Sequence, residues 1–283
     1  MLLESPTYPG ALAAVRRSGL RAVGVPMSPG GWDVDGIAAT VRQSGPALAY
    51  LVPDFHNPTG LLMDDATRVA LGTVLARTRT AVVVDETFVE LSLADTPMPL
   101  PFAAHAPGAL TIGGVSKAFW GGLRVGWLRA PAEDVAALVD ARHSLDLGTP
   151  VLEQLVAVEL LAQRETALAT RRAMIREQRD ALINAVRDRL PRWRLRVPTG
   201  GLALWCELPE PRCSDLVRAA ERHGVLLASG GQFGVEGGLE RFLRLPFILP
   251  PDELTEAVAR IARAWDASLD EPGVITPRPR LIA

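Results

Sequence analysis

The sequence predicts an α/β protein with a mostly parallel sheet covered by helices, followed by a smaller α+β C-terminal domain. Short apolar strands alternate with helical segments in the first half, which is typical of parallel sheets with helices on both faces. A long helical stretch then precedes a second set of short strands and an amphipathic helix. We therefore divide the chain into a large domain at 1–150, a linking helix at 151–190, a small domain at 191–270 and an irregular tail at 271–283.

The elements of the large domain follow from apolar runs and from helical spacing. Apolar residues three and four apart predict helices at 10–18, 33–43, 64–77 and 132–144. Asp64 or Asp65 is a suitable N-cap for the third of these helices. Short apolar or β-branched runs predict strands at 1–3, 22–26, 47–52, 81–84, 108–112 and 125–129.

The small domain is predicted in the same way. A stretch rich in Ala, Leu, Arg and Glu over 150–190 indicates one long helix, because Pro191 ends it and no sustained heptad indicates a coiled coil. The following segments predict a strand, glycine turn and strand over 192–209, further strands at 224–228 and 241–246, and helices at 214–223 and 252–265. The tail contains three prolines and is expected to be irregular.

Composition narrows the class of protein. The chain has 283 residues, a formal net charge of -2 and no apolar run long enough to span a membrane. We therefore expect neither nucleic acid nor membrane as a partner. The N-terminus has no basic region typical of a signal peptide, and Cys206 and Cys213 are too few for a disulfide framework or a metal cluster. The sequence predicts a cytoplasmic protein without a metal site.

The segment TIGGVSKAFWGGLRVGW, at 111–127, contains the most reactive combination of residues. Lys117 follows an apolar strand and precedes a glycine pair and Arg124. A lysine amine in an apolar pocket loses solvation and can attack a carbonyl, and an arginine fork suits phosphate. The alternative is a surface loop that happens to contain a lysine and an arginine.

This segment resembles the Schiff-base lysine segment of the fold-type I, pyridoxal phosphate (PLP) dependent aminotransferases of class I/II. The seven-residue spacing from Lys117 to Arg124 is close to that of the aminotransferase domains of MocR-type regulators, which fuse a GntR-family helix-turn-helix to such a domain. The resemblance implies that Lys117 binds the cofactor PLP covalently. Gly114 stands where the family often has a phosphate-binding serine. The resemblance therefore implies that Ser116 and Arg124 are the donors that remain for the cofactor phosphate.

Asp85, at the end of the strand AVVVD, has two interpretations. It can be a helix N-cap or loop residue, or its carboxylate can pair with the protonated ring nitrogen of PLP. The motif DETF stands where the family has D-x-x-Y, and this favours the second interpretation, with Asp85 and Lys117 as the catalytic pair. Phe88 replaces the tyrosine that donates to the phenolate oxygen of the cofactor, so we expect a shifted pH optimum.

Three further residues complete the implied site. Asn57 in HNPTG resembles the asparagine that binds the phenolate oxygen, although N-P-T-G is also a good turn sequence. Tyr8 in PTYPG resembles the aromatic residue that stacks on the cofactor ring, or it is an aromatic packed near a chain end. Arg244 in RFLRLPF resembles the arginine that binds the substrate α-carboxylate, with Arg241 as a competitor and a surface arginine as the alternative.

The start of the chain departs from the family pattern. The segment ESPTYPG normally lies inside the large domain, after another strand and a glycine-containing turn that opens a phosphate-binding helix. Here that strand, that turn and a helix-turn-helix segment do not precede it. The sequence therefore resembles an N-terminally truncated member whose first strand has lost its upstream neighbours.

The resemblance implies a homodimeric aminotransferase that moves an amino group between an amino acid and a 2-oxo acid. An alternative is the effector-sensing, aminotransferase-like half of a transcription regulator, with little or no turnover. A third possibility is a truncated remnant that binds no cofactor. Keto-acid formation and the absorbance of bound cofactor distinguish the three.

Overall fold

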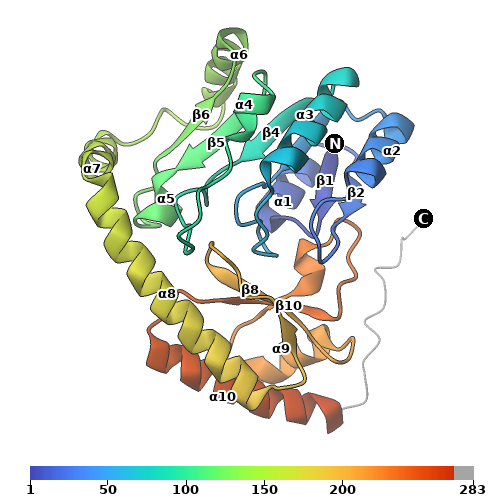
Figure 1. Cartoon of the computed structure of the whole chain (residues 1–283), viewed down its shortest axis with the longest axis vertical. Coiled ribbons are helices and arrows are strands. Elements are labelled where there is room, and N and C mark those ends of the chain that lie inside the picture. The colour runs from blue at the N-terminus through green and yellow to red at the C-terminus, as the bar shows by residue number, and fades with distance from the viewer. Residues whose placement is uncertain (271–283) are drawn as a thin grey trace.

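The computed structural model describes residues 1–270, and the tail predicted at 271–283 lies outside the described residues. The large domain is built on a six-stranded sheet with strand order β2-β1-β3-β4-β5-β6 (Figure 1). All neighbouring pairs are parallel except β5 and β6. Its strands are β1 (Leu2–Ser5), β2 (Val23–Pro26), β3 (Leu48–Leu51), β4 (Ala81–Asp85), β5 (Leu110–Gly114) and β6 (Gly126–Arg129). The predicted mostly parallel sheet is confirmed.

Helices cover this sheet from two sides. On one face an apolar cluster joins the strands to α2, α3 and α4, and on the other a smaller cluster joins β1 and β3 to α1. Asp64 caps α3 by accepting a hydrogen bond from the Thr67 N–H at 2.7 Å, as the sequence predicts. The helices are α1 (Pro9–Arg17), α2 (Val34–Ser44), α3 (Asp65–Arg77), α4 (Phe102–His105), α5 (Val115–Ala118) and α6 (Ala132–Arg142).

The first strand is not isolated, although the sequence shows no strand before it. β1 lies between β2 and β3 and pairs with both in parallel. Leu2 and Leu3 are fully buried, one in the cluster on each face of the sheet. The segment that contains Tyr8 therefore starts from an interior strand of the described sheet.

The small domain has a four-stranded antiparallel sheet with order β7-β8-β10-β9. In Figure 1 the helices α8 and α10 cross beneath this sheet, and α8 runs up to α7 at the side of the large domain. Its elements are α7 (Val151–Ala162), α8 (Arg164–Arg189), β7 (Arg194–Leu195), β8 (Ala203–Glu207), α9 (Cys213–Arg222), β9 (Ala228–Ser229), the 3-10 turn η1 (Gly230–Phe233), β10 (Phe242–Pro246) and α10 (Pro251–Asp270).

Two predicted elements differ in the structure. The helix expected over 151–190 is divided at Gln163, whose φ of -102° and ψ of 19° are not helical, and the next residue, Arg164, turns to bind Glu90 through two hydrogen bonds. The strand expected at 224–228 is reduced to β9, because Gly224 adopts a left-handed φ of 73° and β10 pairs only with residues 228 and 229. The short elements α4, α5 and η1 were not predicted, since none is long enough to show a period.

The core of the small domain extends into the large one. Its main apolar cluster joins α8, α9, α10, β8 and β10 to four side chains from the loops that follow β3 and β4, namely Phe55, Phe88, Leu91 and Leu93. Gly200 permits this contact, because a Cβ there would lie 2.3 Å from the Phe55 ring and 2.5 Å from the Leu91 carbonyl oxygen. The two loops are thus fixed between the domains.

No helix among residues 1–270 is long and apolar enough to cross a membrane.

Candidate active site

A cavity of about 680 Å³ runs along the α1 side of the sheet and includes the carboxyl ends of the parallel strands. Parallel strands place the residues that follow them at one edge of the sheet, where open α/β sheets bind ligands. The residues after β1, β3, β4 and β5 meet here. The cavity is lined by seven of the eight residues predicted from the sequence, namely Tyr8, Asn57, Asp85, Phe88, Ser116, Lys117 and Arg124.

Asp85 ends β4 and presents a carboxylate held from two sides. Its Oδ1 accepts the Thr87 N–H at 3.0 Å, and its Oδ2 accepts the hydroxyl of Tyr50 at 2.6 Å. No helix begins directly after Asp85, since the next one is α4 with Pro101 at its N-cap. The interpretation of Asp85 as a helix N-cap is therefore wrong. Its carboxylate lines the cavity.

Lys117 lies on the short helix α5 and reaches toward the loop that follows Asp85. Its Nζ lies 5.9 Å from the centroid of the Phe88 ring, within the range of a cation–π contact. Phe88 is buried in the small-domain core. Lys117 itself is exposed, so the loss of solvation expected from an enclosed apolar pocket is not seen. The amine is accessible from the cavity.

Ser116 and Arg124 line the cavity together with Lys117. Arg124 is exposed and has a left-handed φ of 53°, which is uncommon for a residue with a side chain. Among the described residues no carboxylate forms an ion pair with it. A hydroxyl and an unpaired guanidinium suit an anionic group such as a phosphate.

Arg244 does not line the main cavity but a small adjoining pocket, which shares Asn57 and Phe88 with it. Arg244 comes from β10, its Nε is buried without a hydrogen-bond partner, and burial lowers its pKa. The Oδ1 of Asn57 is also buried without a partner. The competitor Arg241 is exposed and donates to the Pro209 carbonyl oxygen at 2.7 Å. Arg244 is therefore the arginine that faces the site.

Tyr8 stands at the N-cap of α1 and is 45% exposed, so it is not simply a packed aromatic near a chain end. Its ring lies over Gly10, where an added Cβ would approach ring carbons to 2.5 Å and 2.6 Å. A residue with a side chain at position 10 would displace the ring. Gly10 thus permits the orientation in which Tyr8 borders the cavity.

Sequence reasoning missed two groups behind the cavity. Tyr50 was taken as part of an apolar strand, and nothing in the run ALAYLV distinguishes its hydroxyl. Glu4 is fully buried, accepts the Trp32 Nε1–H at 2.5 Å and the Val52 N–H at 3.0 Å, and lies 3.2 Å from Nε2 of His56. An acidic residue inside the strand MLLES was the available signal, because buried charges need partners.

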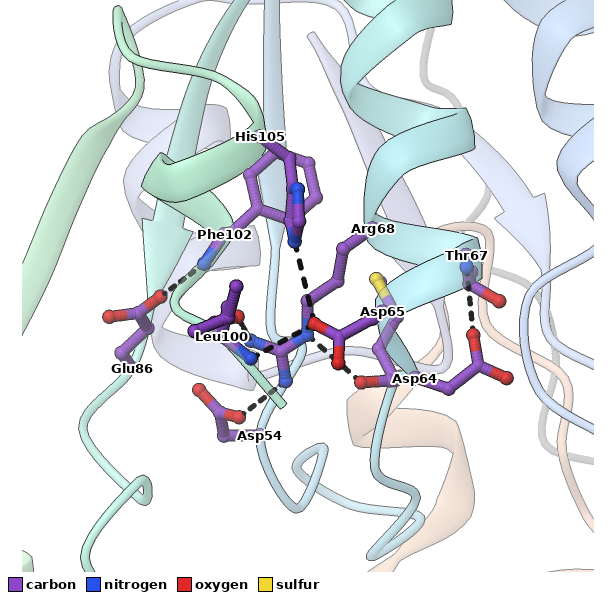
Figure 2. Close-up of polar contacts among 10 residues, drawn as sticks. Asp54, Asp64, Asp65, Thr67, Arg68, Glu86, Leu100, Phe102 and His105 are labelled. Carbon is purple, nitrogen blue, oxygen red and sulfur yellow. Dashed lines mark hydrogen bonds and ion pairs between the residues drawn. The ribbon is translucent and has the colours of Figure 1, made fainter. Parts of the chain in front are cut away.

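A second polar cluster is centred on Arg68 (Figure 2). Arg68 is fully buried and donates to the carbonyl oxygens of Met63 (2.9 Å) and Leu100 (3.0 Å) and to Asp54 Oδ1 (2.7 Å). Glu86, directly after Asp85, accepts the Phe102 N–H at 3.1 Å. This cluster connects the loop after β3 to α3 and to the segment before α4.

Within residues 1–270 there is neither a candidate metal site nor a reactive thiol. No group of His, Cys, Asp and Glu within 1–270 could hold a metal ion. Cys206 and Cys213 are free and buried, and burial raises the pKa of the first thiol to about 12 and of the second to about 11. Both thiols stay protonated and unreactive.

Comparison with known proteins agrees with this geometry. The family model described as aminotransferase class I and II matches residues 1–261. A 2-aminoadipate transaminase of Thermus thermophilus is 34% identical over 93% of this chain, which spans 68% of that protein. The HTH-type transcriptional regulator YisV of Bacillus subtilis is 30% identical over 72% of the chain, which spans 43% of its length.

Solved structures give the same result. The α-aminoadipate aminotransferase LysN of Thermus thermophilus, complexed with N-(5'-phosphopyridoxyl)-L-leucine, superposes with a TM-score of 0.89 at 34% identity, covering 95% of this chain and 71% of that one. A kynurenine aminotransferase of Pyrococcus horikoshii superposes with a TM-score of 0.87 at 26% identity, covering 95% and 70%. The predicted fold is that of these proteins.

Proposed function

Because the chain belongs to the class I and II aminotransferase family, we propose that it transfers an amino group between an amino acid and a 2-oxo acid with PLP as cofactor. The observation that supports this most is the convergence of an amine, a carboxylate, a guanidinium, an amide and an aromatic ring on one cavity. These groups come from the ends of four separate strands. A surface loop that merely contains a lysine and an arginine would not bring groups from several strands together.

The residues present fit the cofactor. Lys117 supplies the amine for its carbonyl carbon, and Asp85 supplies an anionic partner for its ring nitrogen. Ser116 and Arg124 would hold the phosphate, Asn57 the phenolate oxygen, and Tyr8 one face of the ring. The donor from Asn57 to the phenolate oxygen would be its Nδ2–H group. Its Oδ1 is buried without a partner and could accept from a donor group of a ligand, because buried polar atoms normally have a partner.

The chemistry follows from these positions. The cofactor, when bound, supplies a conjugated ring that accepts electrons from the substrate Cα. Arg244 binds the substrate carboxylate and orients the Cα–H bond. The Lys117 amine would take the proton from the substrate Cα, and the resulting ammonium would give that proton to the cofactor carbon that carried the carbonyl. Asp85 would place its carboxylate beside the ring nitrogen.

The decisive experiment is absorbance of the chain mixed with PLP, followed by keto-acid formation from a panel of amino acids. We expect a visible band in the wild type, its loss in Lys117→Ala, and a fall in turnover of roughly 10³-fold or more. Arg77→Ala on the far helix α3 is the control and should leave both unchanged. A wild-type protein without a band at saturating PLP would contradict the proposal.

A second candidate function is effector sensing, which the similarity to a helix-turn-helix regulator supports. In that case the wild type would show the PLP band and respond to amino acids, yet form no keto acid. The chain spans about half or less of such regulators, so any link to DNA binding concerns the longer proteins. The cytoplasmic location indicated by the sequence stays a prediction.

We also propose that two copies of the chain associate through α6 and α7. No residue of α6 is buried, and Ala157 is the single buried residue of α7. Leucines and valines are exposed along α7, including Leu152 at 74% and Leu155 at 61%. Exposed apolar patches of this kind mark interfaces. Light scattering should give the mass of a dimer for the wild type and for the control Val69→Glu on α3, and that of a monomer for Leu155→Glu.

A further inference from the structure

The hydrogen bond between Tyr50 and Asp85 has a consequence for the reaction proposed above, on which this inference rests. Tyr50 lies on β3 and is 5% exposed. It pairs in register with Val83, two residues before Asp85, so its side chain and that of Asp85 share one face of the sheet. The Tyr50 hydroxyl lies 2.6 Å from Asp85 Oδ2.

The direction of this hydrogen bond is fixed. Burial and the nearby carboxylate of Asp85 both raise the pKa of Tyr50, and Glu4 adds to the effect. The phenol therefore keeps its proton and can only donate to the carboxylate. A carboxylate that accepts donated hydrogen bonds is stabilised in its ionised form.

The other oxygen of Asp85 is held as well. Its Oδ1 accepts the Thr87 N–H, so each oxygen has one donor from the protein. Since each carboxylate oxygen can accept about two hydrogen bonds, a lone pair remains on each for a donor inside the cavity. The two donors fix the plane of the carboxylate.

We propose that Tyr50 is a positioning residue whose hydroxyl donates to Asp85 and holds the carboxylate oriented toward the cofactor, so that the proton between Asp85 and the ring nitrogen stays on the nitrogen. Without the hydroxyl the carboxylate loses this donor, and the proton moves toward the carboxylate. The ring then accepts electrons less readily, although substrate binding does not change.

The test is the ¹⁵N chemical shift of ring-labelled PLP in the holoprotein, measured with Tyr50→Phe. We expect the signal to move from the position of a protonated pyridine toward that of an unprotonated one. In steady-state kinetics kcat should fall by roughly tenfold with KM unchanged. The control is Thr111→Val on β5, the strand on the other side of β4, which removes a buried hydroxyl that has no hydrogen-bond partner. It should leave the signal in place.

A second measurement keeps Tyr50 in place and so does not depend on the folding of Tyr50→Phe. The chain contains two tyrosines, so 3-fluorotyrosine incorporated in a Tyr8→Phe background labels Tyr50 alone. Its more acidic hydroxyl donates more strongly, and the ¹⁵N signal should move further toward the protonated position. An unchanged ¹⁵N signal in either experiment overturns the role of Tyr50. Absence of the PLP band in the wild type would instead refute the proposed function.

Discussion

Two sets of buried polar groups, the cluster around Arg68 and the groups at the cavity and its adjoining pocket, differ in how fully their atoms are paired. In the cluster around Arg68 (Figure 2), the guanidinium donates to three oxygens of the protein. In the small pocket beside the cavity, Arg244 Nε and Asn57 Oδ1 are buried without partners. Unpaired buried groups are costly, so they are expected where a ligand supplies the partner. The first cluster stabilises the fold, and the second is available for binding.

One atom of the cluster around Arg68 is itself unpaired. Asp54 Oδ2, in the paired cluster, also lacks a partner, and burial raises the pKa of Asp54 although Arg68 opposes the shift. Asp54 nevertheless holds one firm contact, at 2.7 Å from Arg68, and does not line the cavity. We therefore assign it to the fold. Variants of the two arginines test the distinction.

The largest effect is expected from Arg68→Met. Removing one partner of a buried ion pair leaves a buried charge on Asp54, and such changes destabilise by about 3–5 kcal/mol. Urea unfolding should show this loss. The matched control is Arg142→Met, which breaks the half-exposed pair with Asp146 and should cost far less, because solvent screens such pairs. Equal losses in the two variants would contradict the structural role.

The next effect concerns binding rather than stability. Arg244→Lys removes the planar fork suited to a carboxylate, and we expect KM for the amino acid to rise by about 10–100-fold. The urea midpoint should not fall, because the replaced guanidinium is desolvated and its Nε is unpaired. Arg241→Lys is the control, with KM unchanged. If Arg244→Lys destabilised the protein as much as Arg68→Met, the two clusters would not differ in kind.

The sequence predicted much of this site because parallel strands place their carboxyl ends together. Asp85 and Lys117 each follow an apolar run, so their arrival at one edge is a consequence of topology. Tyr50 was not predictable in this way, since its role depends on its register with β4 and on a contact between residues 35 apart. The exposure of Lys117 was not predictable either, because it depends on packing around α5.

Interruptions within predicted helices and strands could not be predicted from the sequence either. The helix composition of 151–190 continues through position 163, and the interruption beside Arg164 involves Glu90, more than 70 residues away. The segment at 224–228 has the apolar content of a strand, yet its neighbour β10 pairs only at 228 and 229. Local patterns predict element types well when no distant partner competes.

A smaller effect is expected from Phe88→Tyr, which restores the hydroxyl donor implied by the family pattern. A donor to the phenolate oxygen of the cofactor favours its ionised form. We expect the pH midpoint of the visible band to fall by about one unit. The measurement is a spectral titration of both proteins. Because Phe88 is buried in the small-domain core, urea unfolding of both proteins should be measured alongside the titration. If both proteins are stable and their spectral titration midpoints are identical, the hydroxyl has no effect on the cofactor.

The smallest effect concerns Glu86, which belongs to the paired cluster. Burial raises its pKa above the usual value, and the nearby Asp54 carboxylate adds to this shift. A carboxyl group with a raised folded-state pKa contributes stability at low pH, and that contribution is lost as pH rises through the folded pKa. In Glu86→Gln the amide oxygen can still accept the Phe102 N–H, but the side chain no longer titrates.

The free energy of unfolding, measured by urea at several pH values above 4.5, should therefore decline less steeply with pH in Glu86→Gln than in the wild type. Parallel curves would mean that Glu86 titrates in the folded protein as it does in the unfolded chain, and the carboxyl would then not share the buried environment of Asp54 and Arg68.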